Sequence, residues 1–263
     1  MFKSLSLKVI IFGFIFTFFS SFGQSFFLGL FNSSIRDTLS ITQGQFGSIY
    51  ASATLLSSFL LIWAGKKIDD INIFKFAFFV TILLSFSCFF FSKISSVIFL
   101  FIAIFLMRFS GQGMMSHIAT TTISRYFTKS RGKALSTRWC GLSTAEFLLP
   151  VLIVYLLTIT TWQNIWTLIS ILVLIFLPIT SFILIKELNF DSREYVNHKE
   201  FEERDIKQWK RIEVLKDYRF YVVCLNMLAM PWIATGVFVY QSFITESKEW
   251  STFVIAQSFM VYS

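Results

Sequence analysis

Two ionisable side chains, Arg108 and Glu146, lie inside long apolar runs of the sequence. On membrane-insertion scales an arginine at the centre of a spanning helix costs roughly 2.5–3.5 kcal/mol, so it must face a cavity or an acidic partner. At about 1.5 Å per helical residue, both side chains lie at roughly 15–20 Å depth. Two interpretations stay open: a structural ion pair within one helical bundle, or a mobile pair in which Arg108 binds a substrate and Glu146 takes a proton.

Polar side chains elsewhere in the apolar runs extend this set. His117 follows Arg108 in the same run, and we expect it to be either part of a proton relay or a histidine held by a hydrogen bond at a helix end. Gly111 and Gly113 flank Gln112 and are suited to the close approach of a neighbouring helix. The remaining polar candidates within the runs are Gln24, Asn226 and Tyr240.

The residues that usually bind metals or form disulfides are scattered. Cys88, Cys140 and Cys224 stand singly, without a CxxC or Cys/His spacing, so neither a disulfide framework nor a metal site is indicated. A membrane-bound enzyme would need a cluster of carboxylate, His or Cys side chains at the membrane face, and the runs contain one Glu and one His on different helices. We therefore expect no enzymatic activity, no metal and no cofactor.

Composition places these residues in a membrane protein. Of 263 residues, 55% are hydrophobic and only 14% are charged, against about a quarter in an ordinary soluble domain. There are 35 Phe and only 3 Pro, so the apolar excess comes in long uninterrupted runs. A water-soluble globule and a disordered chain are both excluded. A chain of this length has room for about seven or eight spanning helices.

Seven apolar runs are long enough to cross a membrane, given that about 20 residues are needed. They cover residues 9–31, 46–64, 74–92, 97–117, 139–157, 165–185 and 220–244. An eighth run starts at Trp250 and is shorter than a full span where the sequence stops at Ser263, so we expect an unfinished helix. The sequence therefore predicts an all-α, polytopic membrane protein.

The basic residues indicate the direction of the chain in the membrane. Most of the 23 Lys and Arg residues fall at the N-terminus and in the loops after the second, fourth and sixth runs. These segments share one side, and the positive-inside rule makes that side cytoplasmic. The net charge of +8 is thus explained by topology, and no nucleic-acid partner is expected.

One long polar segment divides the runs. Residues 187–218 carry acidic and basic side chains in similar numbers, which indicates a solvated cytoplasmic linker between two bundles. Ile206, Trp209 and Ile212 recur every third residue, so a short amphipathic helix at the headgroup level is expected, with a partner-binding helix as the alternative.

Six spans, a charged linker and further spans form a layout that resembles the major facilitator superfamily, whose two six-helix halves are joined in this way. The loop after the second run reads GKKIDDINIFK from Gly65, and the loop after the fourth reads RYFTKSRGKA from Arg125. Both resemble the loops of that superfamily at these positions. The resemblance implies an N-terminal six-helix bundle at residues 1–186, the linker, and the start of a second bundle at 219–263.

The resemblance also implies a gate on the cytoplasmic side. It assigns gating roles to Gly65 and Asp69, with Arg125 and Arg131 as basic residues of the neighbouring loop. The glycine would permit a tight helix exit, and the aspartate would cap the next helix and pair with those cations. The sequence departs from the family pattern where Asp70 replaces a basic residue and Asn72 replaces a second glycine.

Several segments resemble the bacterial branch that contains monocarboxylate and oxalate/formate transporters. They are Gly23-Gln24, residues 46–50, residues 108–113 and the entry to the seventh run at residues 213–220. The resemblance implies that the first, fourth and seventh helices line a central cavity with Gln24, Arg108, Gln112, Asn226 and Tyr240. A drug/proton antiporter would have a glycine-rich fifth helix ending in Gly-Pro, whereas here Leu149 precedes Pro150.

The resulting expectation is a secondary transporter of the bacterial inner membrane that moves a small organic anion by alternating access. Its coupling ion would be a proton, with Glu146 and His117 as candidate carriers, or a counter-anion. We expect a monomer when full length, and a sequence that ends before the second bundle is complete. The alternatives are an exporter of drugs or metabolites in the same superfamily and a truncated membrane protein that does not transport.

Overall fold

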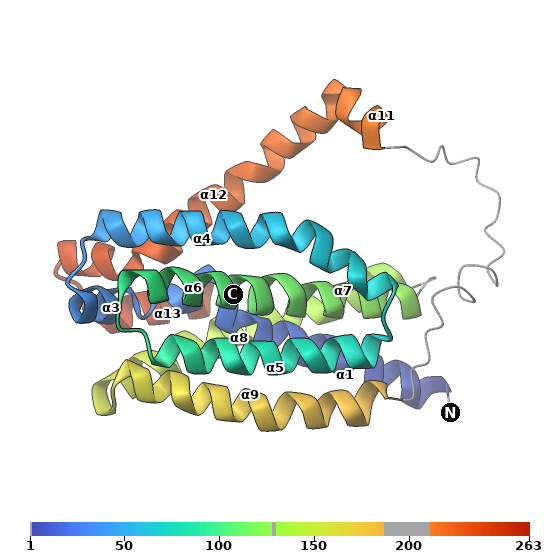
Figure 1. Ribbon diagram of the computed structural model, residues 1–263, viewed down its shortest axis with the longest axis horizontal. Coiled ribbons are helices and arrows are strands. Elements are labelled where there is room, and N and C mark those ends of the chain that lie inside the picture. Colours follow the sequence, from blue (N-terminus) through green and yellow to red (C-terminus); the bar gives the residue numbers. More distant parts are fainter. Residues whose placement is uncertain (1, 128–129, 187–210) are drawn as a thin grey trace.

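The structure is a computed structural model that describes residues 2–127, 130–186 and 211–263 (Figure 1). Every element within these ranges is helical. Seven helical segments are long and apolar enough to cross a membrane, which confirms the expected all-α, polytopic class. The seven segments are Leu5–Gly29, Gln43–Asp69, Ile73–Ser92, Val97–Tyr126, Arg131–Ile159, Trp162–Ile185 and Tyr218–Ser247.

Two of the spans have a segment that is not α-helical in their interior. The first consists of α1 (Phe2–Ser20), the short η1 (Ser21–Gly23) and α2 (Ser25–Gly29). The fourth consists of α6 (Val97–Met107), the π-helical η3 (Arg108–Met115) and α7 (Ser116–Tyr126). The remaining elements are α3 (Asn32–Leu39), α4 (Gln43–Ala64), η2 (Gly65–Asp69), α5 (Ile73–Ser92), α8 (Arg131–Ile159), α9 (Trp162–Ile185), α11 (Arg211–Lys216), α12 (Tyr218–Ser247) and α13 (Thr252–Tyr262).

The first six spans pack side by side as one bundle, whereas α12 joins it only at one end. Contacts run between α5 and α9, α1 and α8, α1 and α7, and α4 and α6. Helix α12 meets α2, α3 and α4 and then leans away from α4 toward α11 (Figure 1). We call the end of the bundle that carries α3 the Arg36 end, and the opposite end, where η2 and α7 meet, the Arg125 end.

Aromatic side chains fill much of the interior between the helices. Trp166 of α9 is fully buried, and its ring lies 4.6 Å from that of Phe91 and 5.1 Å from that of Phe31. Lipid is as apolar as these side chains, so dense packing rather than the hydrophobic effect holds such helices together. Apolar residues on the outer faces, such as Ile98 and Leu168, are exposed, as a lipid-facing surface requires.

Two helices approach closely where η1 meets the π-helical segment. Gly23 and Gly111 touch through their backbones: a Cβ on Gly111 would lie 2.8 Å from the Cα of Gly23. Gln24 has extended backbone angles, φ −80° and ψ 153°, which interrupt the first span at this contact. The close approach expected at Gly111 is therefore present, and it coincides with irregular geometry in both helices.

The described ranges leave part of the expected organisation untested. Ile206 and Trp209 of the expected amphipathic helix lie outside the described residues, while Ile212 lies in the short helix α11. The domain boundaries at 186 and 219 stay predictions.

Substituting Gly111 with alanine tests the contact between the two irregular segments. Gly111→Ala should lower the free energy of unfolding of the purified protein by roughly 1–3 kcal/mol, and with it the melting temperature, because the added methyl meets backbone that cannot rotate away. Gly236→Ala is the matched control, since no atom lies within 4 Å of a Cβ there. Equal melting temperatures for the two variants would contradict the steric argument.

Candidate functional site

Arg108 begins the π-helical segment, and its guanidinium reaches the interrupted part of the first span. The side chain is buried, with 7% exposed. Its Nη1 donates to the backbone oxygen of Gly23 at 3.0 Å and to the Oγ of Ser25 at 3.2 Å. Gln24 lies between these two residues, so the arginine binds the chain on both sides of the helix break. This contact joins the first and fourth spans in the interior of the bundle.

Tyr50 brings a third span to the same place. The guanidinium carbon of Arg108 lies 5.4 Å from the centre of the Tyr50 ring, a cation–π distance. The Tyr50 hydroxyl donates to the Oγ of Ser25 at 2.9 Å, so Ser25 accepts from both side chains. Arg108, Ser25 and Tyr50 thus form one connected network across α2, α4 and η3.

A pocket of about 230 Å³ adjoins the guanidinium. Its lining combines the amide of Gln112 with hydroxyls of α4: the residues are Thr54, Ser57, Ser58, Leu61, Arg108, Gln112 and Gly113. Within the described residues, the Nε of Arg108 has no hydrogen-bond partner and no carboxylate lies within ion-pair distance of the side chain. A buried cation with neither a counter-charge nor all of its donors satisfied is a strong attractor for an anion.

Glu146 lies apart from this network, on α8. Across the described ranges its carboxylate forms no ion pair, so the structural Arg108–Glu146 pair considered from the sequence is not formed in this structure. Glu146 is half-buried. A carboxyl group in a membrane span without a fixed partner can gain and lose a proton as its access to water changes.

The expected polar wall of the cavity is assembled only in part. Arg108 and Gln112 share one pocket, and Gln24 marks the helix break next to them. Asn226 is exposed on the part of α12 that leans away, and its amide donates to the Val222 oxygen within its own helix. Tyr240 instead places its hydroxyl over Gly47 of α4, 2.5 Å from where a Cβ would stand.

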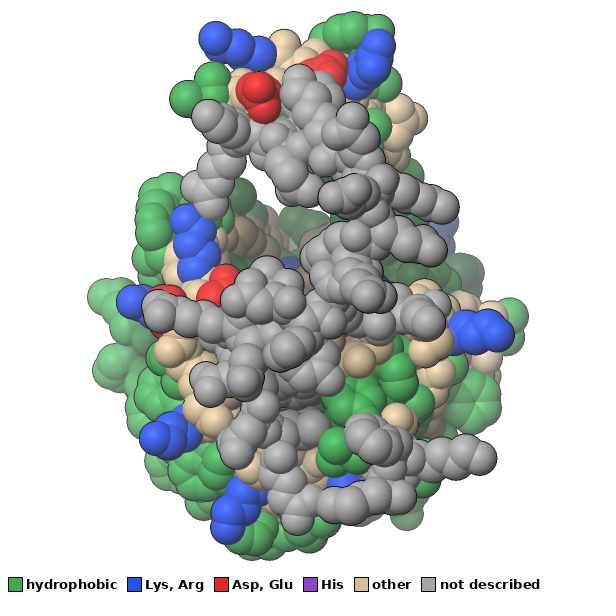
Figure 2. All heavy atoms as spheres, turned by 90° about the vertical axis from the view of Figure 1, so that its right-hand side faces the viewer, with side chains coloured by type: hydrophobic (Ala, Val, Ile, Leu, Met, Phe, Trp, Pro, Cys, Tyr) green, Lys and Arg blue, Asp and Glu red, His purple; other side chains and the backbone are tan. Residues whose placement is uncertain are grey.

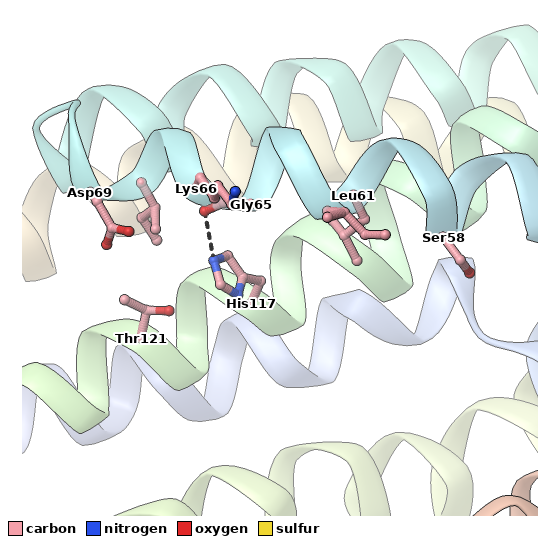
Figure 3. Close-up of a pocket in the computed structure, with 9 residues that line it drawn as sticks. Ser58, Leu61, Gly65, Lys66, Asp69, His117 and Thr121 are labelled. Carbon is pink, nitrogen blue, oxygen red and sulfur yellow. Dashed lines mark hydrogen bonds between the residues drawn. The ribbon is translucent and has the colours of Figure 1, made fainter. Parts of the chain in front are cut away.

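A second cluster lies at the Arg125 end, around a pocket of about 390 Å³ (Figure 3). His117 of α7 points toward η2, and its Nε2 lies 2.9 Å from the backbone oxygen of Gly65. Arg125 forms an ion pair with the carboxylate of Asp69 and also donates to the Ile68 oxygen at 3.3 Å. The fourth span is thereby tied to the loop after the second by one ion pair and two contacts to backbone oxygens.

The physical reasons expected for two loop residues need correction. Gly65 has right-handed helical angles, φ −60° and ψ −32°, and an added Cβ would meet His117 at an ordinary 3.5 Å, so no tight exit requires glycine there. Asp69 does not cap the next helix, because Asn72 does: its Oδ1 accepts from the Phe74 N–H at 3.0 Å. Arg131 donates to the Phe127 oxygen at 3.4 Å and forms no ion pair within the described ranges.

Sequence reasoning missed a second buried arginine. Arg138 stands just before an apolar run, which predicts a loop position, but α8 begins at Arg131 and carries Arg138 into the bundle with 4% exposed. Its Nε donates to the Thr17 Oγ1 at 3.0 Å, and its guanidinium carbon lies 4.4 Å from the centre of the Trp139 ring. Gly13, one turn before Thr17 on α1, gives no signal for this burial, because the space beside it is filled by Ile123 and a Cβ there would lie at an ordinary 3.8 Å from that of Arg138.

These features define a polytopic helical membrane protein whose interior holds a guanidinium beside a small polar pocket. The sequence model of the Major Facilitator Superfamily matches residues 13–263, and the chain belongs to that superfamily. Its members are secondary transporters that move small solutes across membranes. A search of curated proteins finds no match. The expected superfamily is therefore confirmed, whereas the monocarboxylate and oxalate/formate branch stays a prediction.

The ion pair at the Arg125 end gives a test with a matched neighbour. Asp69→Asn should speed backbone amide hydrogen exchange in residues 65–72, because it removes the charge that holds η2 against Arg125. The effect on global stability should stay within about 1 kcal/mol, since Asp69 is largely exposed. Asp70→Asn, one residue on and also exposed, should leave the exchange unchanged. Equal exchange rates in both variants would contradict the role of the Asp69–Arg125 ion pair in holding η2.

Proposed function

We propose that the protein is a secondary transporter of a small organic anion, with Arg108 as the anion-binding residue. The observation that carries the proposal is the buried guanidinium whose Nε lacks a partner among the described residues and whose pocket holds no carboxylate. An anionic substrate would supply both the missing charge and the missing acceptor. A pocket of about 230 Å³ suits a solute of a few heavy atoms, such as a monocarboxylate.

Alternating access is supported by the unequal closure of the two ends. At the Arg36 end α12 is fastened to α2 and α3: Asn32 donates to the Val239 oxygen at 2.8 Å, and Ser242 donates to the Gly29 oxygen at 3.1 Å. Toward the Arg125 end α12 leans away from α4 (Figure 1). The structure thus corresponds to a state closed at the Arg36 end, and transport would require this seam to open while the other end closes.

The distribution of charge supports a direction of the chain in the membrane. Figure 2 looks onto the Arg125 end and shows Lys and Arg side chains around its rim. The positive-inside rule would place this end, and with it the N-terminus, in the cytoplasm of a bacterial inner membrane. The closed Arg36 end would then face outward.

Uptake by the protein in liposomes tests the anion proposal. Wild-type protein should accumulate at least one of formate, acetate, lactate or oxalate. Arg108→Gln should reduce this uptake by about a hundredfold or more, since a lost charged hydrogen bond costs about 3 kcal/mol, and Arg108→Lys should retain part of it. Lys93→Gln, at an exposed loop lysine, is the control for charge alone. Unchanged uptake by Arg108→Gln, or no uptake of any anion by wild type, would refute the proposal.

Proton coupling is proposed for Glu146, the acidic residue within a span that has no ion-pair partner among the described residues. Glu146→Gln cannot release a proton, so uptake driven by an imposed pH gradient should be lost while exchange of labelled for unlabelled anion continues. Glu249→Gln, outside the spans, should preserve both activities. Full gradient-driven uptake by Glu146→Gln would assign the coupling elsewhere.

A further inference from the structure

A separate, partly open cavity of about 280 Å³ lies at the Arg36 end, lined by residues of α3, α8, α12 and α13. It shares no lining residue with the Arg108 pocket. Ser33, Thr158, Gln241, Thr245 and Glu246 supply its main polar groups. Side chains of Leu30, Val154, Leu157 and Ile255 supply the apolar part of its lining.

Gln241 presents a buried acceptor that has nothing to accept from within the described chain. Its side chain is 2% exposed, and its Nε2 donates to the Phe26 backbone oxygen at 2.8 Å. Because a carbonyl oxygen can only accept, this bond fixes which end of the amide is nitrogen. The other end, Oε1, is buried without a hydrogen-bond partner among the described residues. Leaving a buried acceptor unpaired costs about 1–3 kcal/mol, so the position favours a ligand that donates.

Two of the hydroxyls that line the cavity have already used their protons. Thr245 Oγ1 donates to the Ser242 oxygen at 2.7 Å, and Thr158 Oγ1 donates to the Tyr155 oxygen at 2.7 Å. A hydroxyl has one proton and two lone pairs, so each of these groups can only accept from a further partner. They therefore add to Gln241 as acceptors.

The one ionised group that lines the cavity is acidic. The Glu246 carboxylate accepts from Ser33 Oγ at 2.5 Å and from Arg36 Nη2 at 3.1 Å. Two carboxylate oxygens offer about four lone-pair sites, so capacity for another donor remains. Arg36 offsets the charge of Glu246 but is not among the lining residues.

We propose that this cavity binds a small primary ammonium compound with a short alkyl chain, such as n-butylammonium. The ammonium group has three donors and no acceptor, which is the complement of Gln241 Oε1, the two threonine hydroxyls and the Glu246 carboxylate. The alkyl chain lies against the leucine, valine and isoleucine side chains. A ligand that contacts α3, α8, α12 and α13 together also holds the Arg36 end closed.

Calorimetric titration of the purified protein in detergent tests this site without any transport assay. n-Butylammonium should bind, while butyrate, n-pentanol and choline chloride at equal concentration should not. Gln241→Leu should weaken binding about tenfold or more, because it removes the buried acceptor. Thr245→Val retains the shape of the side chain and removes one acceptor, so it should weaken binding severalfold even if Gln241→Leu fails to fold.

The control is Gln257→Leu, at an exposed glutamine of α13 that does not line the cavity, and it should bind as wild type does. Equal affinity of Thr245→Val and wild type, or heat signals of equal size for butyrate or pentanol, would overturn the proposal. So would a complete lack of binding by wild type. Because Arg108 plays no part in this cavity, Arg108→Gln should bind n-butylammonium normally whatever its effect on anion uptake.

Discussion

The contact between the Arg108 guanidinium and the Gly23 carbonyl accounts for most irregular features of the bundle. A cation at this depth needs acceptors, and an unbroken helix keeps its carbonyls within its own hydrogen-bond ladder. The first span is interrupted at Gln24, which makes a backbone oxygen and the Ser25 hydroxyl accessible. The two helices must then approach without a Cβ between them, as Gly23 and Gly111 allow. The π-helical turn at Arg108 belongs to the same adjustment, since such turns re-aim side chains at functional sites.

The two polar cavities described here have opposite hydrogen-bonding character. Beside Arg108 the unsatisfied buried groups are the donor Nε and the Thr54 hydroxyl, and at the Arg36 end the unsatisfied buried group is an acceptor, Gln241 Oε1. In Arg108 and Gln241, one polar group of the side chain donates to a backbone oxygen and another is left without a partner. Arg108 Nη1 donates to the Gly23 oxygen, and Gln241 Nε2 donates to the Phe26 oxygen. The remaining group of each side chain is thereby held in place. Fixed, unsatisfied polar atoms are what allow a small cavity to discriminate between ligands of opposite charge.

The sequence is sufficient to predict the spans and the burial of Arg108, because long apolar runs and a charge within one of them are local signals. It is not sufficient to predict the burial of Arg138, because that burial depends on where α8 begins and helix ends are only weakly encoded in a sequence. Similar depth leaves the pairing of Arg108 with Glu146 open, because depth takes no account of the direction in which α8 presents Glu146. Asn226 shows the same limit: its type suits a cavity, but its position depends on the tilt of α12. Asn72 as the true cap of α5 could have been found from its place before the apolar run.

The seam between α12 and the first span combines close packing at Gly29 with a set of weak hydrogen bonds. Its hydrogen bonds run from side chains to backbone oxygens: Asn32 to Val239, Gln241 to Phe26 and Ser242 to Gly29. Interhelical hydrogen bonds in membranes contribute only about 0.6 kcal/mol each, and the half-exposed Arg36–Glu246 pair adds little more. These polar contacts together can be exchanged at a cost of a few kcal/mol, within the range of ordinary conformational equilibria. The Arg108 contact differs, because separating it would leave a buried cation without any acceptor. Motion is therefore expected at the α12 seam, while the first and fourth spans move together as one body.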